Sequence, residues 1–173
     1  MTRELLILRH AKSDWKTDTD DFHRPLKPRG KRGARQIGIW LAQQGIIPDI
    51  VISSPAQRAR DTTERACKAM GFPKKAICYE KRLYLADLTT LLTLLKNVPP
   101  SAQRVLLVGH NPGLEALLQY LVHESLDMPG DGKLLPTATV ARLDMPKDWH
   151  ELAVAQARLL SITRAKTLPG ETA

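Results

Sequence analysis

Short apolar runs alternate along this chain with longer segments whose apolar residues recur at helical spacing. The clearest runs lie at 4–9, 49–53 and 104–108. Runs this short and this continuous are typical of buried strands in a parallel sheet. Weaker signals predict a strand near 76–79 and two late strands near 137–143 and 151–162. The last of these alternates apolar and polar positions over most of its length, as a half-buried strand does.

Helices are predicted between the strands, over residues 28–44, 55–70, 87–97 and 112–123. Ser54 and Asn111 are the expected N-caps of the second and fourth helices, since each precedes a proline. Gly45 is the expected C-terminal cap of the first helix. Strands that alternate with helices in this way predict an α/β domain built in layers.

Composition agrees with one globular domain. The chain has 173 residues, of which 43% are hydrophobic and 25% charged, and it shows no repeat or linker. We expect a single domain over 1–165 and a flexible tail over 166–173. No apolar run approaches the roughly 20 residues of a membrane span, and no signal peptide is recognised. The interpretation is a cytoplasmic protein in which Cys67 and Cys78 are reduced thiols.

The net charge of +8 is compatible with nucleic acid, a membrane surface or anionic substrates as partners. The densest basic stretch spans residues 24–35 and contains no acid. It also lacks the interleaved aromatics of a single-strand binding platform, so nucleic acid is a weak prediction. We interpret most of the stretch as a solvated helix face, and the alternative is a rim that attracts phosphorylated substrates.

Three of the predicted strands end in unusual polar groups. The first ends in Arg9-His10, the second in residues 53–58 with the sequence SSPAQR, and the strand at 104–108 in residues 109–113 with the sequence GHNPG. Parallel strands would bring these ends to one edge of the sheet, where open α/β sheets bind ligands. The three loops therefore predict one shared site.

Arg58 falls in the first turn of a predicted helix, where a cation opposes the helix dipole. An anion bound between Arg58, Arg9 and the free N–H groups of the helix would explain this position. The alternative is an exposed arginine tolerated at small cost.

His10 and His110 are the candidate chemical groups of this site. A neutral imidazole can act as a nucleophile, and nearby arginines favour the neutral form by lowering its pKa. A single histidine at a strand end is more often structural, but two of them beside two arginines favour function. His110 is expected to donate to an oxygen of the group that is transferred.

The sequence lacks the motifs that mark other classes of nucleotide-binding protein, hydrolase and metalloenzyme. The sequence has no GxxxxGK[ST], no GxSxG, no HExxH and no cysteine followed by the arginine of a cysteine-dependent phosphatase loop. Asp18-Thr19-Asp20 lies in a polar loop and not at a strand end, so an aspartyl-phosphate site is not favoured. We expect neither a metal nor a cofactor.

Several short motifs occur in an order that resembles the histidine phosphatase superfamily, and more closely its small SixA-type branch, the phosphohistidine phosphatases. They are LRHAKS at 8–13, RPL at 24–26, SSPAQRA at 53–59, LY at 83–84 and GHNP at 109–112. The resemblance implies a phosphoglycerate mutase-like fold, a three-layer α/β sandwich with a mostly parallel central sheet flanked by helices. It also implies that His10 is phosphorylated and that Arg9, Arg58 and His110 hold the phosphoryl oxygens. Ser13 and Asn111 are expected beside the substrate.

Two positions depart from the family pattern. Ala11 stands where the family usually has glycine, and Asn111 stands where many members have a proton-donating aspartate. Glu80 and Asp87 are the remaining candidates for a general acid. An alkoxide leaving group needs a proton, whereas phosphohistidine can leave as neutral imidazole.

The sequence therefore predicts a metal-independent phosphatase that acts on phosphohistidine of a signalling or phosphotransfer protein. The alternatives are a phosphatase of a small phosphorylated metabolite and a noncatalytic phosphate-binding module.

Overall fold

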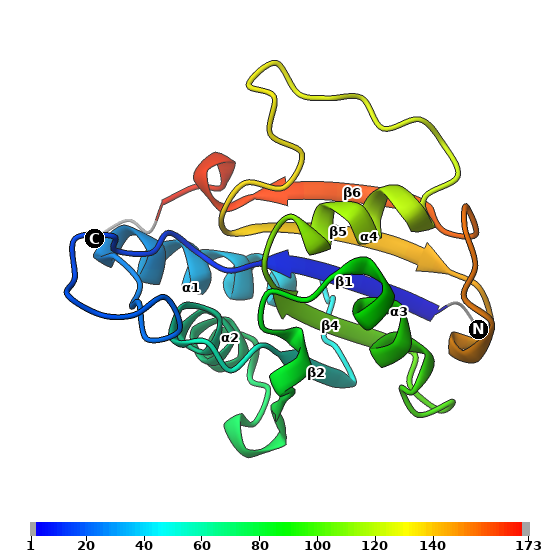
Figure 1. The fold of residues 1–173 in the computed structure, drawn as a ribbon, viewed down its shortest axis with the longest axis horizontal. Coiled ribbons are helices and arrows are strands. Elements are labelled where there is room, and N and C mark those ends of the chain that lie inside the picture. Colours follow the sequence, from blue (N-terminus) through cyan, green and yellow to red (C-terminus); the bar gives the residue numbers. More distant parts are fainter. Residues whose placement is uncertain (1–2, 171–173) are drawn as a thin grey trace.

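A six-stranded sheet in the order β3-β2-β4-β1-β5-β6 forms the centre of the computed structural model, which describes residues 3–170 (Figure 1). The strands are β1 (Arg3–Arg9), β2 (Ile50–Ser53), β3 (Cys78–Tyr79), β4 (Arg104–Gly109), β5 (Thr139–Met145) and β6 (Arg158–Arg164). The four strands β3, β2, β4 and β1 are parallel to one another. Strand β5 runs against both β1 and β6, so it alone is reversed. The predicted mostly parallel sheet is confirmed.

Helices cover both faces of the sheet and make a three-layer sandwich (Figure 1). The helices α1 (Pro28–Gln43) and α2 (Gln57–Met70) cover one face, and α3 (Leu88–Lys96) and α4 (Gly113–Leu121) cover the other. Side chains of β1 alternate between the two cores. Leu6 and Leu8 pack with α1 and α2, while Leu5 and Ile7 pack with α3 and α4. Burial on both faces explains why β1 is continuously apolar.

Close backbone contacts fix where α1 lies. A Cβ atom added at Gly38 would lie 2.3 Å from the carbonyl oxygen of Ala66 in α2, and one added at Gly30 would lie 2.1 Å from that of Lys12. The N–H group of Lys27 donates to the same Lys12 oxygen at 2.9 Å. The start of α1 is thereby held against the loop that leaves β1 and carries the predicted site.

Helix boundaries differ from the prediction by one to two residues. Helix α2 begins at Gln57 and not at Pro55, with Ala56 as its N-cap. Helix α4 has Pro112 as N-cap and ends at Leu121, two residues before the predicted end. The C-cap of α1 is Gln44, and Gly45 follows it with φ +70°, the left-handed conformation that commonly closes a helix.

The predicted strand over 151–162 is wrong in its first half. Trp149–Glu151 form a 3-10 turn, and Ala155 has a positive φ of 59° that no strand accommodates. Val154 is 62% exposed, while Leu152 and Ala157 are buried. The alternation along this segment therefore comes from a loop that packs against the domain, and β6 begins only at Arg158.

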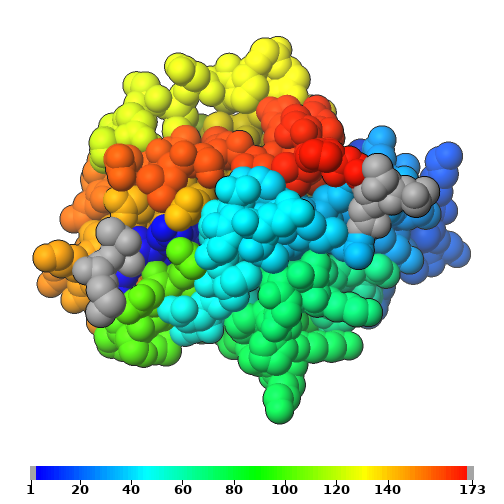
Figure 2. All heavy atoms as spheres, turned by 180° about the vertical axis from the view of Figure 1, so that it is seen from behind, coloured from blue at the N-terminus to red at the C-terminus, as the bar shows by residue number. Residues whose placement is uncertain are grey.

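The C-terminal segment lies beside α1. Figure 2 shows the red residues after β6 against the cyan and blue residues of α1. Residues Ala165–Thr167 form a 3-10 turn, and Leu168 packs half-buried on the core beneath α1 and α2. The last part of the predicted tail, 171–173, lies outside the described residues.

Cys67 is buried and Cys78 exposed, and both are free thiols. Within residues 3–170, no helix has the length and apolar character needed to cross a membrane.

Candidate active site

The carboxyl ends of β1, β2 and β4 converge on one pocket of about 270 Å³. Strand register causes this convergence, because Arg9 pairs with Gly109 and Ser53 pairs with Val108. The ring centroids of His10 and His110 lie 5.3 Å apart as a result. All six residues predicted for the site line this pocket: Arg9, His10, Ser13, Arg58, His110 and Asn111.

His10 is 6% exposed and held in one tautomer. Its Nδ1 lies 2.8 Å from the carbonyl oxygen of Ala11. A carbonyl oxygen only accepts, so Nδ1 carries the proton and Nε2 keeps its lone pair. Burial lowers the pKa of His10 to about 3, and the charges of His110, Arg58 and Arg9 act in the same direction, against the Ala11 hydrogen bond. The imidazole is therefore neutral at neutral pH.

One hydroxyl ties the His10 loop to α2. Thr62 Oγ1 accepts from the N–H group of Ala11 at 2.9 Å and donates to the carbonyl oxygen of Arg58 at 2.7 Å. Thr62 is fully buried. The backbone beside His10 and the helical turn that carries Arg58 are thus fixed relative to each other.

His110 is positioned by Ser54. Ser54 Oγ accepts from the N–H group of Ala56 at 3.3 Å and lies 2.7 Å from His110 Nε2. With that N–H as its donor, the hydroxyl can direct its own proton to Nε2, which places the ring proton on Nδ1. Nδ1 is buried and has no partner among the described residues. Burial lowers the pKa of His110 to about 3, with Arg58 and Arg9 adding to the effect, so the ring is a neutral donor.

The two arginines are each anchored at one end. Arg9 Nη1 donates to the Leu135 carbonyl oxygen at 3.2 Å. Arg58 donates from Nη1 to the Asp21 carbonyl oxygen at 2.6 Å and from Nη2 to Asp21 Oδ2 at 3.0 Å. The Nε atoms of both arginines are buried and unpaired within residues 3–170. Buried donors are costly without an acceptor, so this cluster fits an anion.

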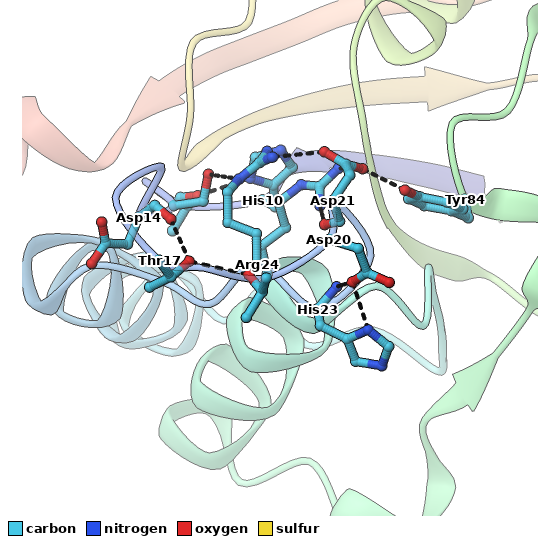
Figure 3. Close-up of polar contacts among 12 residues, drawn as sticks. His10, Asp14, Thr17, Asp20, Asp21, His23, Arg24 and Tyr84 are labelled. Atoms are coloured by element: carbon cyan, nitrogen blue, oxygen red, sulfur yellow. Dashed lines mark hydrogen bonds and ion pairs between the residues drawn. The ribbon is translucent and has the colours of Figure 1, made fainter.

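Asp21 is the main site residue that the sequence analysis missed. Its carboxylate accepts from Arg58, from Arg24 Nη1 at 2.6 Å and from the Tyr84 hydroxyl (Figure 3). Burial raises the pKa of Asp21, but hydrogen bonds from Tyr84, Arg24 and Arg58 outweigh burial and lower it to about 2. Asp21 is therefore an ionised anchor for the arginines. Its position just before the Arg24-Pro25-Leu26 motif was the available signal.

Ser13 and Arg24 support the pocket wall. Ser13 Oγ accepts from Arg24 Nε at 2.9 Å, and the Arg24 guanidinium lies 3.5 Å from the centroid of the Trp15 ring. Arg24 is only 7% exposed, so the interpretation of stretch 24–35 as a solvated face does not hold for this residue. Trp15 and Leu85 line the pocket while remaining 72% and 57% exposed.

The Asn111 amide holds a neighbouring segment of backbone. Its Nδ2 donates to Glu115 Oε1 at 3.1 Å and to the Leu135 carbonyl oxygen at 2.8 Å, the oxygen that also anchors Arg9. Glu115 Oε1 in turn accepts from the Leu135 N–H group at 2.9 Å. Asn111 is not the N-cap predicted for α4, because Pro112 takes that place. Asn111 Oδ1 is buried without a partner among the described residues.

Neither predicted candidate for a general acid lines the pocket. Glu80 binds Arg82 at 3.0 Å, and Asp87 accepts from the N–H group of Thr90 at the start of α3. Over residues 3–170, no three His, Cys, Asp or Glu side chains gather in a group that could hold a metal ion.

The chain is similar to known proteins in both sequence and fold. Residues 5–83, which include both arginines and His10, match the family model of the histidine phosphatase superfamily, branch 1. A protein of Mycobacterium tuberculosis, Rv1276c, is 31% identical over 157 residues, which cover 88% of this chain and 96% of that protein.

Two solved structures, both named as candidate phosphohistidine phosphatases of the SixA type, share the fold. The one from Nakamurella multipartitia has 30% identity and a TM-score of 0.79 over 94% of this chain and 96% of its own. The one from Agrobacterium tumefaciens has 32% identity and a TM-score of 0.79 over 94% and 98%. By the matched family model and by these similarities over nearly its whole length, the chain belongs to the histidine phosphatase superfamily, in its SixA-type branch.

Proposed function

We propose that this phosphatase removes the phosphoryl group from phosphohistidine of a protein by way of a phosphohistidine on His10. The observation that carries the proposal is a neutral His10 that shares its pocket with the hydrogen-bond donors Arg9, Arg58 and His110. The acidic side chain that lines this pocket, Asp21, is held ionised and cannot give up a proton. The two SixA structures, which are named as candidates for this activity, support the same substrate class.

The first step follows from the positions of the donors. The lone pair of His10 Nε2 attacks phosphorus in line, a new N–P bond forms, and the N–P bond of the substrate breaks. Arg9, Arg58 and the Nδ1–H group of His110 hold the equatorial oxygens as their charge redistributes. Because these donors are anchored by Leu135, Asp21 and Ser54, they need no rearrangement at that moment. Water then attacks phosphorus, the bond between His10 Nε2 and phosphorus breaks with its electron pair returning to Nε2, and phosphate leaves with the protons of the water.

The substrate class follows from the ionisation of the pocket. Asp21 lines the pocket, but three hydrogen bonds hold it as a carboxylate. An alkoxide leaving group would forgo the roughly 10²- to 10⁴-fold contribution of a general acid. When phosphohistidine is protonated on its distal ring nitrogen, its histidine side chain leaves as neutral imidazole and needs no proton from a general acid. The pocket therefore favours a phosphoramidate over an alkyl phosphate.

Labelling tests the role of His10. Wild type and His10→Ala are mixed with a ³²P-phosphohistidine peptide and quenched in alkaline detergent, which preserves phosphohistidine. His123→Ala is the matched control, because His123 is exposed and does not line the pocket. We expect label on wild type and on the control but not on His10→Ala, whose turnover should fall by about 10³-fold or more. Label that persists on His10→Ala would remove His10 from this role.

Substrate comparison tests the leaving group. The ratio of kcat/KM for the phosphohistidine peptide to that for an alkyl monophosphate should exceed about tenfold. A preference for the alkyl monophosphate would overturn the proposal in favour of a metabolite phosphatase. Phosphate binding without turnover or label would instead identify a noncatalytic module.

A further inference from the structure

A second cleft of about 310 Å³ adjoins the catalytic pocket. The two hollows share Lys12 and Thr137 in their walls, so they lie next to each other. The second cleft lies between α1 and the segment after β6, two regions that Figure 2 shows side by side. Its wall carries five cationic side chains: Lys12, Arg29, Lys133, Arg164 and Lys166.

The charge of this cleft is only partly balanced. Arg164 donates to Asp131 at 2.6 and 3.2 Å and to the Lys133 carbonyl oxygen, and Lys166 lies 3.8 Å from the same Asp131 carboxylate. In the described part of the chain, the side chains of Lys12, Arg29 and Lys133 have no acidic partner. The cleft therefore presents a net positive charge next to the phosphoryl site.

These cations differ from Arg9 and Arg58, the arginines proposed to hold the phosphoryl group. Arg29, Lys133 and Lys166 are exposed, and their charges come from separate segments of the chain. Lysine is a hydrated point charge on a flexible stem, whereas buried forked arginines suit one phosphoryl group. Scattered exposed charges fit several carboxylates on a surface better than one tetrahedral anion. The exposed Trp15 and Leu85 at the catalytic pocket add apolar area of the kind that contacts protein.

We propose that the cleft lined by Arg29, Lys133 and Lys166 binds acidic side chains that flank the phosphohistidine of a protein substrate. This inference rests on the proposed function and adds to it the kind of sequence or surface that is recognised. Complementary charge raises the rate of encounter and selects partners, and exposed charges act in this way chiefly at low salt.

The test uses two phosphohistidine peptides, one with flanking Asp and Glu and one with Ser and Gln at those positions. The cleft variant is Arg29→Gln with Lys133→Gln, two residues outside the catalytic pocket. The matched control is Lys75→Gln with Lys81→Gln, which removes the same charge beside β3 at the opposite edge of the sheet. The two variants therefore have equal net charge.

At low ionic strength we expect the cleft variant to raise KM for the acidic peptide about fivefold, with kcat within about twofold. KM for the neutral peptide should stay unchanged, and the control variant should leave both peptides unaffected. High salt should remove the wild-type preference for the acidic peptide.

Equal KM for the two peptides in wild type, or equal losses in the cleft and control variants, would overturn the cleft proposal. So would a cleft-dependent gain seen only when a small substrate carries a second phosphate, which would assign the cleft to a metabolite. Turnover of the neutral peptide by wild type is a separate readout, because its absence would count against the proposed function and not against the cleft.

Discussion

The catalytic pocket and the basic cleft are neighbours of similar size and the same sign of charge, yet they are built differently. The pocket encloses about 270 Å³ and the cleft about 310 Å³. In the pocket, His10, Arg58 and His110 are each at most 6% exposed and are held by hydrogen bonds to Ala11, Asp21 and Ser54. In the cleft, Arg29, Lys133 and Lys166 are exposed.

Buried, fixed cations and exposed, flexible cations suit different functions. Fixed buried donors stabilise charge that develops at a defined point, because they need not reorganise during the reaction. Exposed flexible cations act over a longer range and increase the rate of encounter with anions. The pocket is thus suited to chemistry and the cleft to the choice of partner. Substitutions in the two regions should therefore affect different kinetic constants.

The largest contrast is expected between two arginines. Arg58→Ala should lower kcat by about 10²- to 10³-fold, the usual cost of removing one preorganised donor. Arg29→Ala should leave kcat within about twofold, because Arg29 lines only the cleft. Steady-state kinetics with the neutral phosphohistidine peptide measure both, and circular dichroism checks that Arg58→Ala is folded. Similar losses in kcat for the two variants would contradict the separation of roles.

Acid should destabilise the pocket specifically. His10 and His110 have pKa values of about 3 in the folded state, against about 6.5 when unfolded. Between pH 6.5 and 3 the unfolded chain binds more protons, so stability is complete above pH 6.5 and falls as the pH drops. Each histidine should contribute a slope of about 1.4 kcal/mol per pH unit in this window.

Urea unfolding between pH 6.5 and 4.5 measures this slope. His10→Gln with His110→Gln should flatten it, while His123→Gln with His150→Gln, at two exposed positions, should not. If both double variants keep the wild-type slope, the buried pair is not the source of the acid sensitivity.

The smallest effect is expected from Asp21, which acts through Arg58. Asp21→Asn keeps the shape of the side chain but removes the charge that orients Arg58 and Arg24. We expect kcat to fall about tenfold with little change in KM, since a misplaced donor chiefly affects the transition state. Asp20→Asn is the matched control, because Asp20 binds the exposed His23 and does not line the pocket. An equal loss in both variants would show a general effect of the loop.

The sequence predicted the framework of the site well for a physical reason. Strands β1, β2 and β4 are buried on both faces, so their apolar runs are unmistakable, and their parallel register brings Arg9, His10 and His110 together. The predicted helices were right in number and order, with small errors where proline precedes the first full turn.

The sequence could not predict the contacts that anchor the two arginines, because these contacts join segments far apart in the chain. Asp21 reaches Arg58 across 37 positions of the chain, and the Leu135 oxygen reaches Arg9 across 126. The motif that follows Asp21 marks its loop but not its contact with Arg58, and no local pattern marks Leu135. The false strand before β6 has a similar origin, because Leu152 and Ala157 are buried by the packing of an irregular segment whose intervening residue Val154 is exposed.

The hydrogen bond between His10 Nδ1 and the Ala11 carbonyl oxygen also has a consequence after the first chemical step. In the proposed mechanism, the proton held at Nδ1 would let His10 separate from phosphorus as a neutral imidazole when water attacks, without a proton from solvent. The same hydrogen bond that orients the ring for attack would therefore also prepare it to release the phosphoryl group.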